Sequence, residues 1–201
     1  MDQRFDKYKV VKNFMDKDLL SIVHDYLLLQ RKENFSEEIQ PRAGALLEGV
    51  HAVYADLLME VLLEKYLPKV EEITGKELFP TYSYYRVYEK GNMLLVHRDR
   101  PPCEFSVDIC IGFDKPWTLS LQPEDVNLNP GDAVIYRGTE IPHWRDESFE
   151  GSYYIIGLLH YVDKNGKYKG VRFDGRESLG KPRKEFQKEP CVEENPCNEE
   201  S

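Results

Sequence analysis

The segment MLLVHRD at residues 93–99 carries a histidine and a carboxylate two positions apart, His97 and Asp99, at the end of an apolar run. Gly91 and Asn92 form a turn signal just before this run, which is typical of a short β-strand. Successive side chains on a strand point to opposite faces, so His97 and Asp99 project from the same face. One strand therefore offers two ligands to a single metal ion.

A second histidine at a suitable place supplies a third candidate ligand. His143 follows Pro142, which restrains the backbone beside it, and both come after the predicted strand AVIY at residues 133–136. Two histidines and one carboxylate, with three coordination positions left open, are typical of non-heme Fe(II) sites. The sequence predicts such a site at His97, Asp99 and His143, provided that His143 returns beside the other two.

Composition narrows the class of protein. A chain of 201 residues suits one domain, and its net charge of −9 argues against a nucleic-acid partner, because phosphate contacts need clustered Lys and Arg. No apolar run approaches the length of a membrane span, and the N-terminus lacks the apolar core of a signal peptide. Four cysteines do not indicate a disulfide scaffold. We therefore expect a cytoplasmic protein with no membrane partner, in a compartment that keeps iron ferrous.

Helical periodicity marks the first part of the chain, residues 1–79. An acidic turn followed by an apolar stripe predicts a helix over residues 16–27, and a polar, Gly-containing stretch predicts a loop over 31–49. A second periodic segment predicts a helix that begins near residue 54, continues through Pro68 and ends at Gly75. We expect residues 1–79 to be a helical support for the rest of the domain.

The residue pattern changes after Pro80, where runs of aromatic and β-branched residues alternate with turns that contain Gly, Pro or Asn. Strands are predicted over residues 82–88, 93–97, 105–113, 117–122, 133–136 and 153–161. The predicted fold class is mainly β with N-terminal helices, a jelly roll over residues 80–162 buttressed by two long helices. We expect one domain over residues 1–180 and a disordered tail over 181–201, which has little apolar surface to bury.

These motifs resemble the double-stranded β-helix of the 2-oxoglutarate- and Fe(II)-dependent oxygenases, and are most similar to the prolyl-hydroxylase-like branch. The matching residues span about 80–162 and include Tyr88, Gly91, Leu94, HRD at 97–99, PGDAVIY at 130–136 and PHWR at 142–145. The resemblance implies that His97, Asp99 and His143 hold Fe(II). It also implies that 2-oxoglutarate and O2 take the open positions, and that the products are succinate, CO2 and a hydroxylated substrate.

The sequence departs from this family where the distal carboxylate of 2-oxoglutarate is bound. Prolyl-hydroxylase-like members place Arg or Lys nine or ten residues after the distal histidine, where this chain has Ser152 and Tyr153. Three other arginines are candidates for the carboxylate clamp, for which arginine is well suited. Arg86 shares a strand face with Tyr88, which matches a tyrosine in the pocket of the family. Arg145 shares a face with His143 if that strand continues. Arg100 follows the metal motif directly, and its alternative role is to order this loop with Glu104.

Other potential ligands have weaker patterns. Cys103 and Cys110 flank a predicted strand near the site, but their spacing is not that of a zinc site, and we expect buried structural thiols. His160 lies on the last predicted strand without a carboxylate at ligand spacing, so it could at most support a ligand indirectly. Cys191 and Cys197 in the predicted tail receive no role.

Three functions remain open at this point. The leading hypothesis is a 2-oxoglutarate- and Fe(II)-dependent dioxygenase that hydroxylates a peptide, an amino acid or a small molecule. The alternatives are a cupin-like metal enzyme that uses no keto-acid, favoured by the missing basic residue after His143, and a non-enzymatic jelly-roll binding module. The sequence defines neither the primary substrate nor the oligomeric state.

Overall fold

The computed structural model describes residues 5–33 and 50–181. Its helices are α1 (Lys17–Glu33) and α2 (Leu57–Thr74), with two 3-10 segments, η1 (Pro101–Cys103) and η2 (Lys169–Gly175). The described strands are β1 (Tyr8–Val11), β2 (His51–Tyr54), β3 (Leu78–Tyr88), β4 (Leu94–His97), β5 (Phe105–Phe113), β6 (Leu119–Leu121), β7 (Glu124–Val126), β8 (Ala133–Tyr136), β9 (His143–Arg145) and β10 (Tyr154–Asp163).

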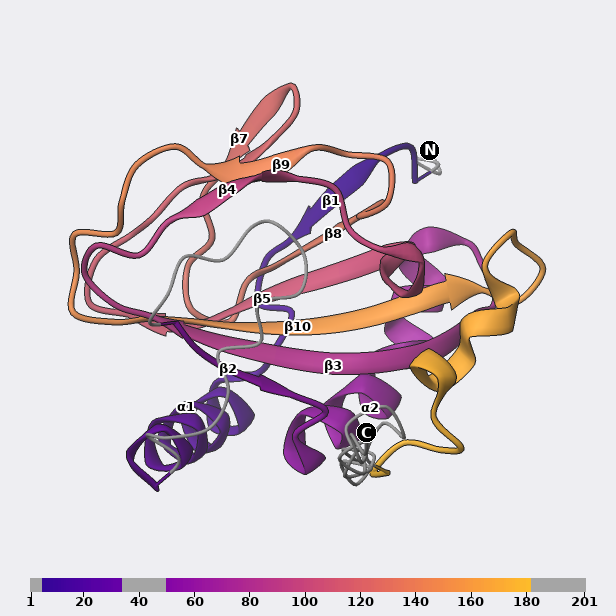
Figure 1. The fold of residues 1–201 in the computed structure, drawn as a ribbon, viewed down its shortest axis with the longest axis horizontal. Coiled ribbons are helices and arrows are strands. Elements are labelled where there is room, and N and C mark those ends of the chain that lie inside the picture. Colours follow the sequence, from indigo (N-terminus) through magenta and orange to yellow (C-terminus); the bar gives the residue numbers. More distant parts are fainter. Residues whose placement is uncertain (1–4, 34–49, 182–201) are drawn as a thin grey trace, which may run out of the picture.

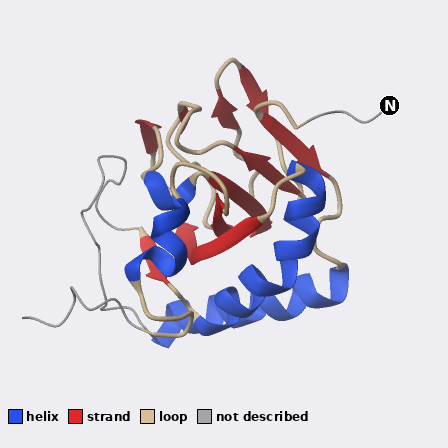
Figure 2. Cartoon of the chain, turned by 90° about the vertical axis from the view of Figure 1, so that its right-hand side faces the viewer, coloured by secondary structure: helices blue, strands red, loops and turns tan. Residues whose placement is uncertain are grey.

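The strands form two antiparallel sheets. The larger has the order β1-β8-β5-β10-β3-β2 and the smaller the order β4-β9-β6-β7. Figure 1 shows the smaller sheet above the larger one, with α1 and α2 beneath, and in Figure 2 helical ribbon lies below the strands and on both sides of their lower part. A mainly β, antiparallel fold with few helices is consistent with the predicted double-stranded β-helix.

The large sheet separates two buried clusters. Along β10, Ile155 and Leu159 belong to the cluster packed against the helices, whereas Tyr154 and Ile156 belong to the cluster between the two sheets. This alternation follows from the two-residue period of a strand. The face turned away from the helices therefore lines an interior, and any group on that face is held above a rigid, helix-backed floor.

Helix α2 continues through Pro68 and ends at Gly75, as the sequence predicted. Asp56 caps its N-terminus through a hydrogen bond from the Met59 amide, and Gly75 ends it with a φ of 66°, a conformation that glycine adopts without strain. Pro68 lies inside the helix, as predicted. The buried face of α2 packs against the large sheet, so these two caps define where the helical support begins and ends.

The predicted helical support over residues 1–79 also contains two strands that were not expected. β1 lies at one edge of the large sheet, where it pairs with β8, and β2 lies at the other, where it pairs with β3. Both strands have four residues, too few for an alternating pattern to stand out from neighbouring loops. They are strands because a longer strand offers each of them its backbone hydrogen bonds, a condition that no local pattern reveals.

Other predictions of this kind fall partly outside the described residues. Helix α1 runs six residues beyond the predicted end at residue 27, to Glu33. Residues 34–49 of the predicted loop and 182–201 of the predicted tail are not described. Among the described residues, neither helix combines the length and the hydropathy needed to cross a bilayer.

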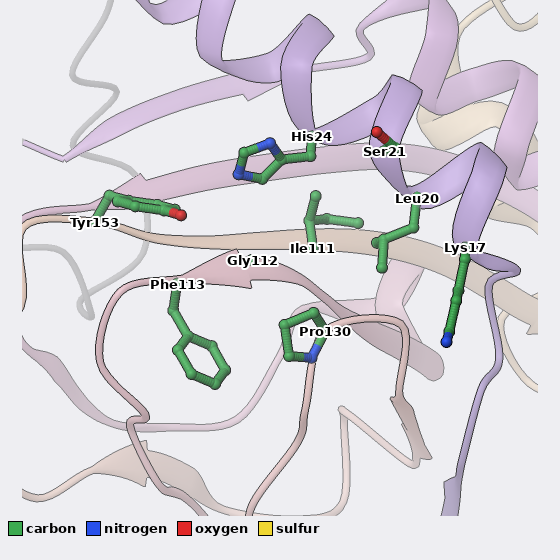
Figure 3. Close-up of a pocket in the computed structure, with 9 residues that line it drawn as sticks. All are labelled: Lys17, Leu20, Ser21, His24, Ile111, Gly112, Phe113, Pro130 and Tyr153. Atoms are coloured by element: carbon green, nitrogen blue, oxygen red, sulfur yellow. The ribbon is translucent and has the colours of Figure 1, made fainter.

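A shallow hollow of ≈ 270 Å³ lies between α1 and the end of β5 (Figure 3). Figure 3 shows His24 of α1 over Gly112, with Phe113, Pro130 and Tyr153 around them. A Cβ atom at Gly112 would stand 2.7 Å from the His24 ring, too close for an undisturbed contact. Glycine at this position therefore lets α1 approach the sheet, and none of His97, Asp99 and His143 contributes to this hollow.

We expect Gly112→Ala to lower the free energy of unfolding by about 1–3 kcal/mol, the range typical of overpacking. The measurement is denaturant unfolding of the wild type and the variant. His24→Ala in the same chain removes the clashing ring and should recover most of the loss. An equal loss in the single and the double variant would show that the loss does not come from a clash with the His24 ring.

Candidate metal centre

Antiparallel pairing brings the two candidate histidines together. In the pairing of β4 with β9, His97 lies directly opposite His143, and their ring centroids are 4.1 Å apart. Asp99 follows β4 and directs Oδ1 at both rings, 3.7 Å from Nε2 of His97 and 3.7 Å from Nε2 of His143. The structure thus assembles all three residues that the sequence singled out for metal binding.

Both imidazoles are held in the tautomer that a metal requires. Nδ1 of His97 is 2.9 Å from the Leu95 carbonyl oxygen, and Nδ1 of His143 is 3.0 Å from that of Ile141. A carbonyl only accepts, so Nδ1 of each ring carries the hydrogen and Nε2 keeps its lone pair. Burial, and next the neighbouring His143, lower the pKa of His97, which favours its neutral form.

Three electron-pair donors therefore converge on one point. The ligand atoms of His97, Asp99 and His143 all lie within 4.8 Å of one another. Two ligands at about 2.1 Å from one ion are separated by about 3–4 Å, so one cation fits among them. Lone pairs that face one another with no hydrogen between them repel, and a bound cation removes this repulsion. The donor set suits Fe(II), because two imidazoles and one carboxylate leave positions open for other ligands.

The second oxygen of Asp99 faces away from this point. Ser106 on β5 donates to Asp99 Oδ2 at 2.8 Å, and Ser106 Oγ is 3.1 Å from Nδ1 of His160. Asp99, Cys103 and His160 form a second group with ligand atoms within 4.8 Å. Burial lowers the pKa of His160 to about 4, so its ring is neutral at ordinary pH.

Sequence reasoning missed Ser106. Its signal was the alternation SVDIC at residues 106–110, in which polar side chains recur at every second position of a strand whose other face is apolar. That period places Ser106 and Asp108 on the interior face, together with Cys110. Cys103 and Cys110 are buried free thiols, as predicted.

Arg86 faces the same interior from β3. Its Nη1 donates to the Tyr88 hydroxyl at 3.0 Å, while its Nε is buried and has no hydrogen-bond partner among the described residues. Its positive charge lowers the pKa of His97, Asp108 and His160, in each case less strongly than burial acts. Arg86 forms no ion pair with the described residues. Arg86 lies opposite Ile156 in the pairing of β3 with β10.

Arg145 is the more deeply buried of the two arginines, with 3% of its surface exposed. It lies on β9, and its guanidinium carbon is 4.6 Å from the ring centroids of both Trp117 and Tyr154. One of its nitrogens donates to the Trp117 carbonyl oxygen, and Nε finds no hydrogen-bond partner in residues 5–33 and 50–181. The described part of the chain offers it no carboxylate within ion-pair distance. Burying an unpaired cation is costly, so two such groups in one interior indicate a site for an anion.

The third arginine has a structural role. Arg100 forms a bidentate pair with Asp174 of η2 at 2.6 Å, and not with Glu104, which accepts from the Asp163 amide. The alternative that Arg100 orders its own loop through Glu104 was therefore wrong in its partner. Ser152 at the family's usual basic position binds Asp114 in a surface turn.

Asp108 is a further buried group on the interior face that sequence reasoning did not single out. Tyr136 donates to its Oδ1 over a long 3.3 Å, and the same hydroxyl is 3.4 Å from His143 Nε2. Burial, and then the charge of Asp99, raise the pKa of Asp108 to about 7, against smaller opposing effects of Arg145, the Tyr136 hydrogen bond and Arg86. The interior therefore holds two fixed positive charges and a carboxyl that titrates near neutrality.

Comparison with known proteins gives no family by sequence and a clear answer by structure. No family model matches the chain, and no curated protein resembles it in sequence. Many solved structures share its fold. One is the non-heme alpha-ketoglutarate-dependent carbocyclase SnoK of nogalamycin biosynthesis, at 15% identity and a TM-score of 0.63 over 78% of this chain and 79% of that one.

Two further structures illustrate the range of ligands on this fold. A prolyl hydroxylase from Trichoplax adhaerens, in complex with a hypoxia-inducible-factor peptide, has 13% identity and a TM-score of 0.61 over 83% of this chain and 87% of that one. HygX from Streptomyces hygroscopicus, with nickel, 2-oxoglutarate and hygromycin B bound, has 10% identity and a TM-score of 0.60 over 79% and 84%. The chain thus has the fold of the 2-oxoglutarate-dependent oxygenases, prolyl hydroxylases included, and the resemblance drawn from the motifs is confirmed at that level.

We expect Asp108→Asn to change how stability depends on pH. Between pH 4 and 7 the folded chain holds a proton on Asp108 and the unfolded chain does not, so the wild type loses stability as pH rises through this range. Asparagine still accepts from Tyr136 but does not ionise. The gain in unfolding free energy of the variant over the wild type should be larger at pH 8 than at pH 5, by roughly 2–3 kcal/mol. Equal differences at both pH values would show that Asp108 has an ordinary pKa.

Proposed function

We propose that this protein is a 2-oxoglutarate- and Fe(II)-dependent dioxygenase that hydroxylates a peptide, an amino acid or a small molecule. The observation that carries the proposal is the convergence of Nε2 of His97, Nε2 of His143 and Oδ1 of Asp99 at 3.7 Å on a fold shared with such oxygenases. In the overall reaction, 2-oxoglutarate, O2 and a substrate C–H bond give succinate, CO2 and a C–OH group.

His97, Asp99 and His143 are the residues that would hold the iron. When bound, the iron supplies the activation of O2 and the oxidative decarboxylation of the keto-acid. The chain itself keeps the two imidazoles neutral and oriented through the carbonyl groups of residues 95 and 141. This orientation requires no rearrangement on metal binding, so the ligand set is preorganised.

Arg86, Arg145 and Tyr88 are the residues proposed to bind the distal carboxylate of 2-oxoglutarate. The Tyr88 ring lies 5.1 Å from Trp117, on which Arg145 also packs, and Arg86 donates to the Tyr88 hydroxyl. The three side chains thus form one continuous wall of the interior. A carboxylate there would meet guanidinium groups that have no other ion-pair partner among the described residues, and would offset their cost of burial. These arginines take the place of the basic residue missing after His143.

The aromatic surroundings of this wall would exclude water. Tyr88, Trp117, Phe149 and Tyr154 are buried together between the sheets. Low local polarity strengthens each charge interaction with the bound keto-acid and limits side reactions. Tyr136 and Asp108 add a hydroxyl and a carboxyl beside His143, so the interior is dry but not uniformly apolar.

Proteins that share this fold bind more than one kind of substrate. HygX has hygromycin B bound and the Trichoplax enzyme has a peptide bound, so a small molecule or a peptide is the kind of substrate proposed for this chain. A cytoplasmic location remains a prediction from composition.

The metal centre has a direct test. We expect His143→Ala to weaken Fe(II) binding on the order of 100-fold or more, beyond what outer residues typically contribute, while the apo-protein unfolds at the wild-type temperature or above. Anaerobic titration of the wild type with Fe(II) and then 2-oxoglutarate should produce a visible charge-transfer band that depends on both. His24→Ala, which changes a histidine outside the site, is the control and should bind iron normally.

Two other outcomes of this titration would contradict the proposal, and each would favour a different function. Iron binding without the band would favour a cupin-like enzyme, and absence of iron binding would favour a binding module. Substitution with Co(II) locates the ion, because a thiolate ligand adds a strong near-ultraviolet absorption. Such an absorption, lost in Cys103→Ala, would place the metal with Asp99, Cys103 and His160 instead of the predicted triad.

The carboxylate clamp predicts a separation of metal and co-substrate affinity. Arg86→Ala and Arg145→Ala should each weaken 2-oxoglutarate binding by about 10- to 100-fold, the loss expected for one charge-assisted hydrogen-bonded pair, with Fe(II) affinity within a factor of about 3. Calorimetric titration of the metal-loaded protein measures both constants. Arg137→Ala removes a surface charge paired with Glu140 and serves as the matched control. If neither interior variant differs from this control, the clamp lies elsewhere.

A further inference from the structure

The hydroxyl group of Ser106 is completely enclosed at the edge of the metal centre. Ser106 has 0% of its surface exposed, and its Oγ contacts Asp99 Oδ2 at 2.8 Å, His160 Nδ1 at 3.1 Å and the Cys103 carbonyl oxygen at 3.4 Å. The register of the large sheet sets this arrangement, because Ser106 lies directly opposite His160 in the pairing of β5 with β10. A fixed strand register thus holds the serine beside Asp99.

The directions of these hydrogen bonds follow from the number of hydrogens available. A hydroxyl has one hydrogen, and the Asp99 carboxylate only accepts, so Ser106 donates to Asp99. The bond between Ser106 Oγ and His160 must then run the other way, with His160 Nδ1–H as the donor. The His160 ring packs 4.5 Å from the ring of Tyr82, which fixes its plane. The result is a directed relay from His160 to Ser106 to Asp99.

Gly138 closes the other side of the same carboxylate oxygen. The Gly138 carbonyl accepts from the Asp99 amide at 2.9 Å, which fixes the backbone of Asp99. A Cβ atom at position 138 would overlap Asp99 Oδ2 and stand 2.7 Å from Ser106 Oγ. Real side-chain carbons do not approach so closely, so a residue larger than glycine would displace the carboxylate.

We propose that Ser106, held by His160, and Gly138 are positioning residues that turn Oδ2 of Asp99 away from the metal and leave Oδ1 as its one ligand atom. This inference rests on the proposed metal centre and names residues that act on it through Asp99. A carboxylate bound through one oxygen leaves a coordination position that binding through both would fill. The relay thus keeps room for the keto-acid and O2, and it adds no net charge beside the metal.

Binding of Mn(II) alone, without keto-acid, tests the relay. We expect Ser106→Ala to weaken Mn(II) binding by about 10- to 100-fold, the range typical when the partner of a ligand is removed. His160→Phe keeps a ring against Tyr82 but loses the donor, and should weaken binding less. In the Ser106→Ala background, His160→Phe should have no further effect, because it acts only through the serine.

Ser83→Ala is the matched control for these variants. Ser83 is a fully buried serine on β3 whose hydroxyl has no hydrogen-bond partner within the described part of the chain, so its removal should leave Mn(II) affinity unchanged. A second measurement needs no metal: nitrogen-15 histidine NMR of the apo-protein should show a slowly exchanging hydrogen on Nδ1 of His160, which exchanges faster in Ser106→Ala.

Two results would overturn the relay. One is a folded Ser106→Ala protein with wild-type Mn(II) affinity. The other is a pair of effects at Ser106 and His160 that simply multiply in the double variant, which would show that the two residues act independently. Failure of the oxygenase proposal has a different signature, namely normal metal binding with no charge-transfer band on addition of 2-oxoglutarate.

Discussion

The pairing of β4 with β9 is the interaction on which the rest of the site depends. It brings His97 opposite His143, although a long stretch of chain separates them, and Asp99 completes the group just past the end of β4. The backbone hydrogen bonds of an antiparallel ladder set positions to within a fraction of a residue spacing. A slip of one residue would turn one imidazole to the other face, so the proposed metal centre depends on the register of the two strands as well as on the identity of the side chains.

The two faces of the large sheet have different surroundings, namely the helices on one side and the interior between the sheets on the other. One face packs apolar side chains against α1 and α2, and the other carries Arg86, Ser106, Asp108 and His160 into the interior. Polar groups on that face cost free energy unless they are partnered, and the stability comes from the helix-backed face. This division explains how a small domain holds several buried charged groups in a defined geometry. The helices support the site mechanically and contribute none of its proposed ligands.

The parts of the molecule that could be predicted from sequence are those with local signals. A local sequence pattern of a few residues was enough to predict helix α2, strand β8 and the motifs around His97 and His143. Strands β1 and β2 could not be found in this way, because only β8 and β3 make them strands. Ser106 and His160 belong to the same category, since each is unremarkable in its own strand and acquires a role through their mutual register. That Arg86 and Arg145 form no ion pair with a described residue likewise depends on the fold, which keeps the described carboxylates beyond ion-pair distance of both.

The position of β4 at the border of the small sheet has a consequence for the order in which the molecule loosens. Among the described strands β4 pairs with β9 only, and its ladder is interrupted between Leu94 and His97, where Val96 is 65% exposed. Such a strand separates from its neighbour in local openings that leave the large sheet intact. A cation shared by His97, Asp99 and His143 acts as a non-covalent cross-link over this weak seam. Release of a metal from the proposed centre would therefore accompany fraying of β4 in the small sheet and would leave the helix-backed core folded.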